Sequence, residues 1–216
     1  MRTPYRTVSG EGNGRYEEKK SRFLSEVYPV TAESDVEPIL CAVRKREYGA
    51  NHHCYAYVIG EKSENKKCSD DGEPQKTAGM PMLSVLEKER LTNVLVVVSR
   101  YFGGTLLGTG GLVRAYESAA KDGLRNAGIE DSIPAVLTAV STDYSDYQKL
   151  SRFFRDEEIL VADSEFGDAV KVIAAISEED AEAFSASVTE LTQGRCKIER
   201  VRETWIRANE KGKRIA

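Results

Sequence analysis

The pattern of apolar and polar positions in the first half of the chain predicts a mixture of strands and helices. Residues 94–98 are five consecutive apolar side chains, which is typical of a strand buried on both faces. Alternating aromatic and β-branched residues predict another strand over 52–59, with His52 and Cys54 on one face and His53 on the other. Shorter strands are expected at 3–8, 15–20 and 22–30, helices at 31–47, 80–90 and 111–127, and a long polar loop at 60–79.

The second half of the chain shows a different order of elements. After an expected linker at 128–134, the pattern predicts strands at 135–141, 159–164, 168–176 and 196–206, with helices at 144–155 and 177–193. This β-α-β-β-α-β order is that of a ferredoxin-like domain. The sequence therefore predicts an α+β protein with domains at 1–134 and 135–207, followed by a polar tail at 208–216 that is expected to fray.

The distribution of charge separates the two halves. The net charge is −4, so the chain as a whole is not a basic nucleic-acid binder of the ordinary kind. Residues 1–135 carry 19 basic and 19 acidic side chains, whereas residues 136–207 carry 9 basic and 15 acidic. The second half would repel phosphate backbones, so any contact with nucleic acid is expected from a local patch in the first half.

The cysteines and the hydropathy of the chain indicate the cellular compartment in which the protein is expected. The four cysteines form no Cys-x-x-Cys pair, which favours a reducing cytosol over a disulfide framework. The first residues have no apolar signal core behind them, and no stretch approaches the roughly 20 apolar residues of a membrane-spanning helix. We expect a soluble cytoplasmic monomer without a cofactor or a membrane partner.

A glycine-rich segment after the apolar run is the most specific local feature. Residues 103–111 contain five glycines, and a helix is expected to begin near Gly110. A strand, a glycine loop and a helix start together present free backbone N–H groups to an anion. The spacing is neither that of a Walker motif nor that of a dinucleotide fingerprint, and the glycines would equally permit a tight packed loop. The candidate anion-binding residues are Arg100, Gly103, Gly104, Gly108, Gly110, Gly111, Arg114 and Thr77.

The polar loop contains three carboxylates within four residues, Asp70, Asp71 and Glu73. They could hold Mg²⁺, activate a water molecule or pair with the arginines, and His52 could serve as an acid–base partner. Asp-Gly and Glu-Pro are also ordinary turn dipeptides, and composition favours the turn interpretation. A zinc site is not expected, because the two histidines and Cys54 are a sparse ligand set.

Motifs that occur in order along the first half resemble the IMPACT/YigZ family. They are Ser21-Arg22-Phe23, residues 50–57, Asp70–Pro74 with Thr77–Gly79, and Arg100–Gly104 with Leu107–Tyr116. The resemblance covers residues from about 15 to 125, and the second half resembles the C-terminal domain of bacterial members. The chain departs from the family pattern at His53, Gln75-Lys76 and Met80. An arginine is usual at position 80, so less positive charge is expected near the acidic loop, although Lys76 can replace part of it.

The resemblance implies a first domain of the ribosomal protein S5 domain 2-like fold and a second domain similar to an elongation-factor G module. Eukaryotic relatives regulate translation by damping the starvation-activated kinase that phosphorylates an initiation factor. They do so partly through an extra N-terminal domain for which this chain has no room, so that partner is not expected here. For the bacterial relatives the resemblance implies no established activity.

Three hypotheses follow. The favoured one is a non-enzymatic, translation-associated regulatory protein whose glycine loop contacts RNA, the ribosome or a translation factor, while the acidic second domain contacts a basic protein. The alternative is a metal-assisted enzyme acting on a phosphorylated small molecule or nucleotide, with Asp70, Asp71, Glu73 and His52 as catalytic candidates. In the third, the motifs only maintain a compact fold.

Overall fold

The computed structural model describes residues 2–208 and 214–215, and the chain divides into two compact units. One unit holds residues 5–130, and the other holds residues 2–4 together with the described part of 131–216. None of the described helices is both long enough and apolar enough to cross a bilayer. Both units combine helices with antiparallel sheets, so the expected α+β class is confirmed.

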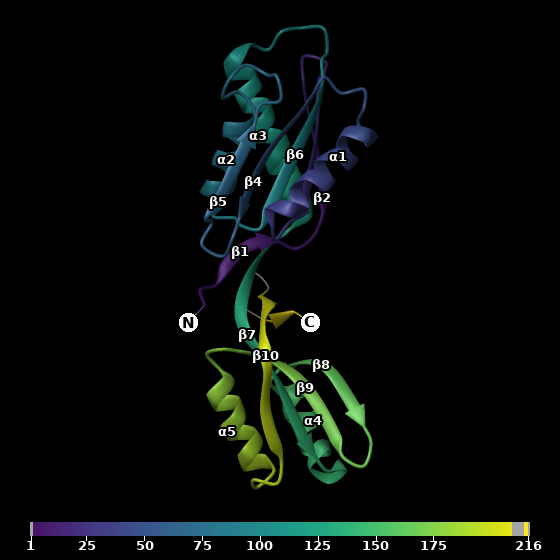
Figure 1. Ribbon diagram of the computed structural model, residues 1–216, viewed down its shortest axis with the longest axis vertical. Coiled ribbons are helices and arrows are strands. Elements are labelled where there is room, and N and C mark those ends of the chain that lie inside the picture. The colour runs from purple at the N-terminus through teal and green to yellow at the C-terminus, as the bar shows by residue number, and fades with distance from the viewer. Residues whose placement is uncertain (1, 209–213, 216) are drawn as a thin grey trace. The chain divides into compact units, whose positions relative to one another are not determined.

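The first unit is a five-stranded antiparallel sheet in the order β2-β3-β6-β4-β5 (Figure 1). Helices α2 and α3 pack on one face and α1 packs on the other. The elements are β1 (Tyr5–Val8), β2 (Gly12–Glu18), β3 (Ser21–Pro29), η1 (Glu33–Asp35), α1 (Val36–Arg46), β4 (His52–Ile59), β5 (Asn65–Ser69), α2 (Gly79–Lys88), β6 (Val94–Tyr101) and α3 (Gly108–Ala127).

Strand β6 is central because its apolar run faces two cores. Val94, Val96 and Val98 pack toward α2 and α3, whereas Leu95 and Val97 pack toward α1. All five are fully buried, as expected for a strand covered by helices on both sides. The same alternation places Cys54 of β4 in the core shared with α2 and α3, which confirms the predicted faces of that strand.

Helix α3 lies unusually close to the sheet. A Cβ at Gly14 of β2 would come within 2.3 Å of the backbone nitrogen of Gly123, and a Cβ at Gly123 would come within 2.6 Å of Ser25 Oγ. Only glycine permits this approach. The Ser25 hydroxyl donates a hydrogen bond to the carbonyl of Ala119 at 2.7 Å, which fixes the helix against β3. These contacts hold the second half of α3 against β2 and β3.

The second unit has the predicted ferredoxin-like order. Strands β10, β7, β9 and β8 lie side by side in that order, all antiparallel, and α4 and α5 share one core with them. The elements are β7 (Ile129–Thr142), α4 (Tyr144–Asp156), β8 (Leu160–Phe166), β9 (Val170–Ser177), α5 (Ala181–Leu191), β10 (Lys197–Ala208) and β11 (Arg214–Ile215).

Three local predictions are wrong. The loop expected at 60–79 contains a strand, β5, which pairs with β4. The linker expected at 128–134 belongs almost entirely to β7, because Ile133 and Pro134 lie opposite Ile206 and Trp205 in the sheet. Within the expected tail, β11 pairs with β10, while positions 209–213 and 216 lie outside the described residues.

Candidate functional site

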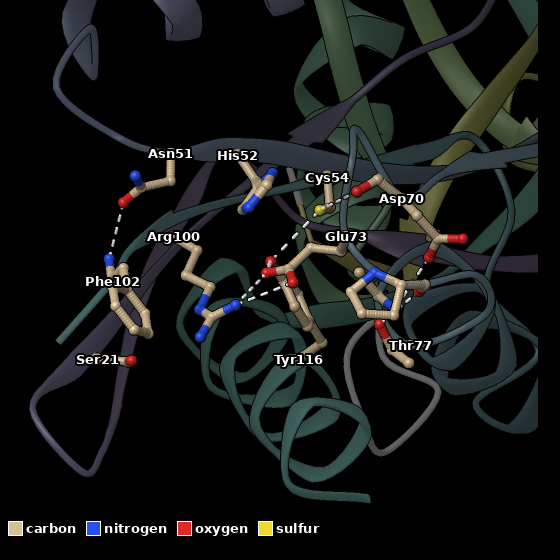
Figure 2. Close-up of polar contacts among 12 residues, drawn as sticks. Ser21, Asn51, His52, Cys54, Asp70, Glu73, Thr77, Arg100, Phe102 and Tyr116 are labelled. Carbon is tan, nitrogen blue, oxygen red and sulfur yellow. Dashed lines mark hydrogen bonds and ion pairs between the residues drawn. The ribbon is translucent and has the colours of Figure 1, made fainter. Parts of the chain in front are cut away.

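A buried ion pair joins the acidic loop to the end of β6. Arg100 Nη1 donates to both carboxylate oxygens of Glu73, at 2.6 and 2.9 Å (Figure 2). Arg100 is 5% exposed and Glu73 is 8% exposed. The guanidinium carbon lies 5.5 Å from the ring centre of Phe23 and 5.6 Å from that of Phe102. Arg100 continues the face of Val94, Val96 and Val98, so its charge enters the core and requires a counter-ion there.

Two neutral side chains complete the cluster around Glu73. The Tyr116 hydroxyl, from α3, donates to Glu73 Oε1 at 2.7 Å. Cys54 Sγ lies 3.3 Å from that hydroxyl and 3.0 Å from the carbonyl oxygen of Asp70. Burial raises the pKa values of both Cys54 and Tyr116 well above their usual range. Both groups therefore keep their protons near neutral pH and act as hydrogen-bond partners.

The Asp70 carboxylate is engaged with the start of α2. It accepts hydrogen bonds from the backbone N–H groups of Lys76, Ala78 and Gly79, at 2.8, 3.0 and 2.8 Å. These donors lie at the amino end of the helix, where a negative charge is stabilising. Asp70 therefore folds residues 70–79 into a compact turn that caps α2.

Asp71 and His52 brace the same loop against β4. The Asp71 carboxylate accepts a hydrogen bond from the backbone N–H of His53 at 2.7 Å. The ring nitrogen Nδ1 of His52 lies 2.8 Å from the carbonyl oxygen of Asp71. His52 thus contacts the backbone of the loop, and Asp71 contacts the backbone of β4. Thr77 is buried, and its hydroxyl donates to the carbonyl of Pro74 at 2.6 Å, which places this candidate inside the loop.

These contacts give the carboxylates of the acidic loop a structural role. Each of the carboxylates of Asp70, Asp71 and Glu73 is already engaged by donors of the protein. In the part of the chain that the structure describes, no group of three or more His, Cys, Asp or Glu side chains could hold a metal ion. The acidic loop and the end of β6 do converge, but they form a structural clamp.

The glycine loop is fixed at its start by two side chains. The N–H of Phe102 donates to Asn51 Oδ1 at 2.9 Å, and the N–H of Gly103 donates to Ser21 Oγ at 3.1 Å. A Cβ at Gly103 would lie 2.1 Å from the carbonyl carbon of Lys20, so only glycine fits. The Gly103 N–H is therefore not available to an anion. In the sequence, Ser21 and Asn51 belong to the family motifs, but nothing there indicates that they fix the glycine loop.

The first turn of α3 keeps its predicted character. The helix begins at Gly108, slightly earlier than expected. Gly108, Thr109 and Gly110 are exposed, whereas Gly111 is buried. No acidic residue lies in the first turn and no side chain caps it. The first backbone N–H groups of a helix have no intrahelical acceptor, so this end carries partial positive charge. Arg114, one turn further along, is also exposed.

Arg100 has hydrogen-bond donors that the protein does not satisfy. Its Nε is fully buried without a partner, and Nη2 has no partner among the described residues. Buried donors without acceptors are uncommon in folded proteins, and each one costs free energy. Only one edge of this guanidinium is held by Glu73. The other edge retains donors for an acceptor that the described part of the chain does not supply.

Comparisons with known proteins agree with the fold and the motifs. Residues 19–124 match the Impact N-terminal domain, and residues 140–195 match a domain of unknown function, DUF1949. The IMPACT family member YvyE of Bacillus subtilis is 36% identical over 202 residues, which cover 94% of this chain and 93% of that protein. The IMPACT family member YigZ of Escherichia coli is 30% identical and covers 86% of this chain and 92% of its own length.

More distant similarity extends the comparison. A solved structure described as the crystal structure of an hypothetical protein superposes with a TM-score of 0.60, covering 94% of this chain and 99% of that chain at 27% identity. Protein IMPACT of Mus musculus is 36% identical over 96 residues, which are 42% of this chain and 30% of that protein.

Proposed function

The chain belongs to the IMPACT family, and from this starting point we propose that it is a translation-associated protein that binds RNA, free or within the ribosome, through an anion site. The site consists of the first turn of α3, the exposed Arg114 and the unpaired edge of Arg100. The proposed association with translation rests on the resemblance to the eukaryotic relatives. The anion is a phosphate of the RNA backbone.

The observation that carries this proposal is the half-satisfied guanidinium of Arg100. Glu73 balances its charge, yet Nε and Nη2 have no acceptor among the described residues. Because Nε is fully buried, we propose that an anionic oxygen binds this edge through Nη2. Because Glu73 already neutralises Arg100, the net attraction for phosphate would come mainly from α3 and Arg114.

The charge distribution favours the first unit as the RNA-binding part. Residues 136–207 carry 15 acidic and 9 basic side chains, so the second unit would repel phosphate. We propose that this second unit contacts a basic protein partner instead. The alternative of a metal-assisted enzyme receives no support from the geometry, because Asp70 and Glu73 hold structural hydrogen bonds and His52 contacts loop backbone.

The test is the salt dependence of RNA binding. Fluorescence anisotropy of a labelled single-stranded RNA of about 12 nucleotides would be recorded between about 50 and 200 mM salt. Loss of one phosphate contact lowers the slope of log K against log salt by about 0.7. We expect that change for Arg114→Gln. The control is Lys45→Gln, which removes an exposed charge from α1 on the opposite face of the sheet.

Two results would overturn the proposal. One is that the wild-type protein binds no RNA at the lowest salt, either as free RNA or as ribosomes in a sedimentation assay. The other is that Arg114→Gln and Lys45→Gln change the slope equally, because a general effect of net charge would then explain the binding. A change confined to Arg114→Gln supports the site on α3.

A further inference from the structure

Phe102 is an aromatic ring that is half exposed and yet firmly positioned. Phe102 is 47% exposed, whereas Phe23, the other aromatic residue over which Arg100 lies, is fully buried. The backbone is pinned on both sides, because Asn51 accepts the N–H of Phe102 and Ser21 accepts the N–H of the next residue. Figure 2 shows Asn51, Phe102 and Ser21 in this arrangement, with Arg100 beside the ring. An exposed apolar ring held in this way is presented to a partner without a further loss of backbone freedom.

One cation lies over this ring, and others lie on neighbouring segments. Arg100 lies over Phe102, and Arg22 lies over the neighbouring Tyr101 at 4.8 Å from its ring centre. The hairpin turn between β2 and β3 consists of Lys19 and Lys20, and Gly103 lets the backbone of Lys20 pack directly against the glycine loop. Both lysine side chains are exposed, and neither has a carboxylate partner among the described residues.

Arg114 belongs to the same end of the sheet as the hairpin. The pKa of Tyr16, on β2, is raised mainly by its hydrogen bond to Glu18, and the positive charge of Arg114 opposes that shift. Tyr16 in turn lies 6.4 Å, centre to centre, from the ring of Phe23, over which Arg100 lies. Arg114 therefore lies close enough to the hairpin for its charge to act on Tyr16, whereas Arg100 reaches the same rings from inside the core.

From this juxtaposition we infer that Phe102 is a stacking platform for an unpaired base of single-stranded RNA, whose backbone follows the Lys19–Lys20 turn and the start of α3. The inference rests on the proposed RNA-binding function and specifies its ligand. Proteins that bind single strands combine a positively charged track with aromatic rings on which bases stack. A duplex offers phosphates to the same cations, but its bases are stacked on each other and give Phe102 nothing to contact.

The size of the effect follows from the stacking. Base–aromatic stacking lost on substitution corresponds to a weakening of roughly 5- to 150-fold per base. Leucine at position 102 keeps an apolar body and the backbone hydrogen bonds to Asn51 and Ser21, so Phe102→Leu is expected to weaken single-strand binding by about tenfold. The slope against salt should stay unchanged, because no phosphate contact is lost. Phe102→Trp should bind at least as tightly as the wild type.

The experiment measures binding of a single-stranded RNA of about 12 nucleotides and of the same sequence as a duplex. The variants are Phe102→Leu, Phe102→Trp and, as a control, Leu106→Ala, which shortens an 82% exposed apolar side chain of the same loop. We expect a loss for Phe102→Leu on the single strand only. A 2-aminopurine base in the RNA should be quenched by the wild type and by Phe102→Trp but less by Phe102→Leu.

The outcomes separate the two proposals. If the wild type binds neither RNA, the proposed function fails and the stacking inference fails with it. If both RNAs bind with the expected salt slope but Phe102→Leu binds the single strand like the wild type, only the stacking inference fails. If Phe102→Leu and Leu106→Ala weaken single strand and duplex alike, the loop is a general apolar contact, as for docking of a protein, and stacking is again excluded.

Discussion

Replacing Glu73 tests the clamp between the acidic loop and β6. Without its carboxylate, Arg100 would remain a buried charge with no counter-ion, and Tyr116 would lose its acceptor. Removal of one partner of a buried ion pair typically costs about 3–5 kcal/mol. We expect Glu73→Ala to lower the free energy of unfolding of the first unit by about 4 kcal/mol, and Glu73→Gln by less, because its amide oxygen can still accept from Tyr116.

A double variant examines the electrostatic origin of this loss. Replacement of a whole buried pair by apolar residues of similar volume is often neutral or stabilising. The variant Glu73→Leu with Arg100→Met should therefore regain at least about 2 kcal/mol relative to Glu73→Leu alone. The exposed pair Lys66–Glu87, at 2.8 Å, serves as the matched control. Glu87→Gln should cost about 0–1 kcal/mol, because solvent screens that pair.

The assay is native-state amide hydrogen exchange of β6 under increasing urea, since the only tryptophan, Trp205, lies in the other unit and does not report on this one. Val96, Val97 and Val98 are buried at the centre of the sheet, so we expect their amides to exchange only when the unit opens globally. A cost below about 1 kcal/mol for Glu73→Ala, equal to that of the exposed control, would refute the reasoning.

The remaining predictions concern the same unit. Asp70→Ala removes the acceptor of three backbone N–H groups, whereas Asp71→Ala removes the acceptor of one. Urea denaturation should therefore show a loss of about 3 kcal/mol for Asp70→Ala and about a third of that for Asp71→Ala, and equal losses would contradict the capping role. Burial and the hydrogen bond to a neighbouring carboxylate raise the pKa of Tyr28 from 10.0 to about 12. The stabilisation that accompanies this shift is present below pH 10 and is lost as the pH rises toward 12. An ultraviolet titration with the Tyr28→Phe variant as reference should show the delayed ionisation. Exposed Cys41 should react with a thiol reagent in the native protein well before Cys54, which is buried and whose pKa burial raises; peptide mapping of the labelled protein checks the order.

The fold could be predicted where burial gives the apolar residues of a strand or helix a regular spacing. The run 94–98 and the alternation at 52–59 correspond to β6 and β4, and the element order of the second half gave the ferredoxin-like unit. Strand β5 could not be found in this way. Its sequence, Asn65 to Ser69, is polar because it is an exposed edge strand whose hydrogen bonds to β4 supply the order. The start of β7 was missed because Gly128 and Pro134 are typical of turns.

The site was predictable in its membership but not in its pairing. The sequence allowed the acidic loop to pair with the arginines, yet it did not show which carboxylate meets Arg100, 27 positions from Glu73. The alternation of side chains along β6 did contain a signal. Arg100 lies two residues after Val98, which faces the core, so Arg100 must face the core as well. Tyr116 was named only as the last residue of a family motif, because nothing local indicates that its hydroxyl meets a buried carboxylate.

The two lysines in the turn between β2 and β3 supply positive charge but lower the thermal stability of the first unit. Lys19 and Lys20 adopt φ values of +46° and +68°, a left-handed geometry for which hairpins strongly prefer Asn-Gly. Each non-glycine residue in this region costs about 1 kcal/mol. An Asn-Gly graft would therefore raise the melting temperature of the first unit while removing two cations. Selection for thermal stability should therefore favour Asn-Gly at these two positions. The resulting protein would be more stable but would bind polyanions more weakly.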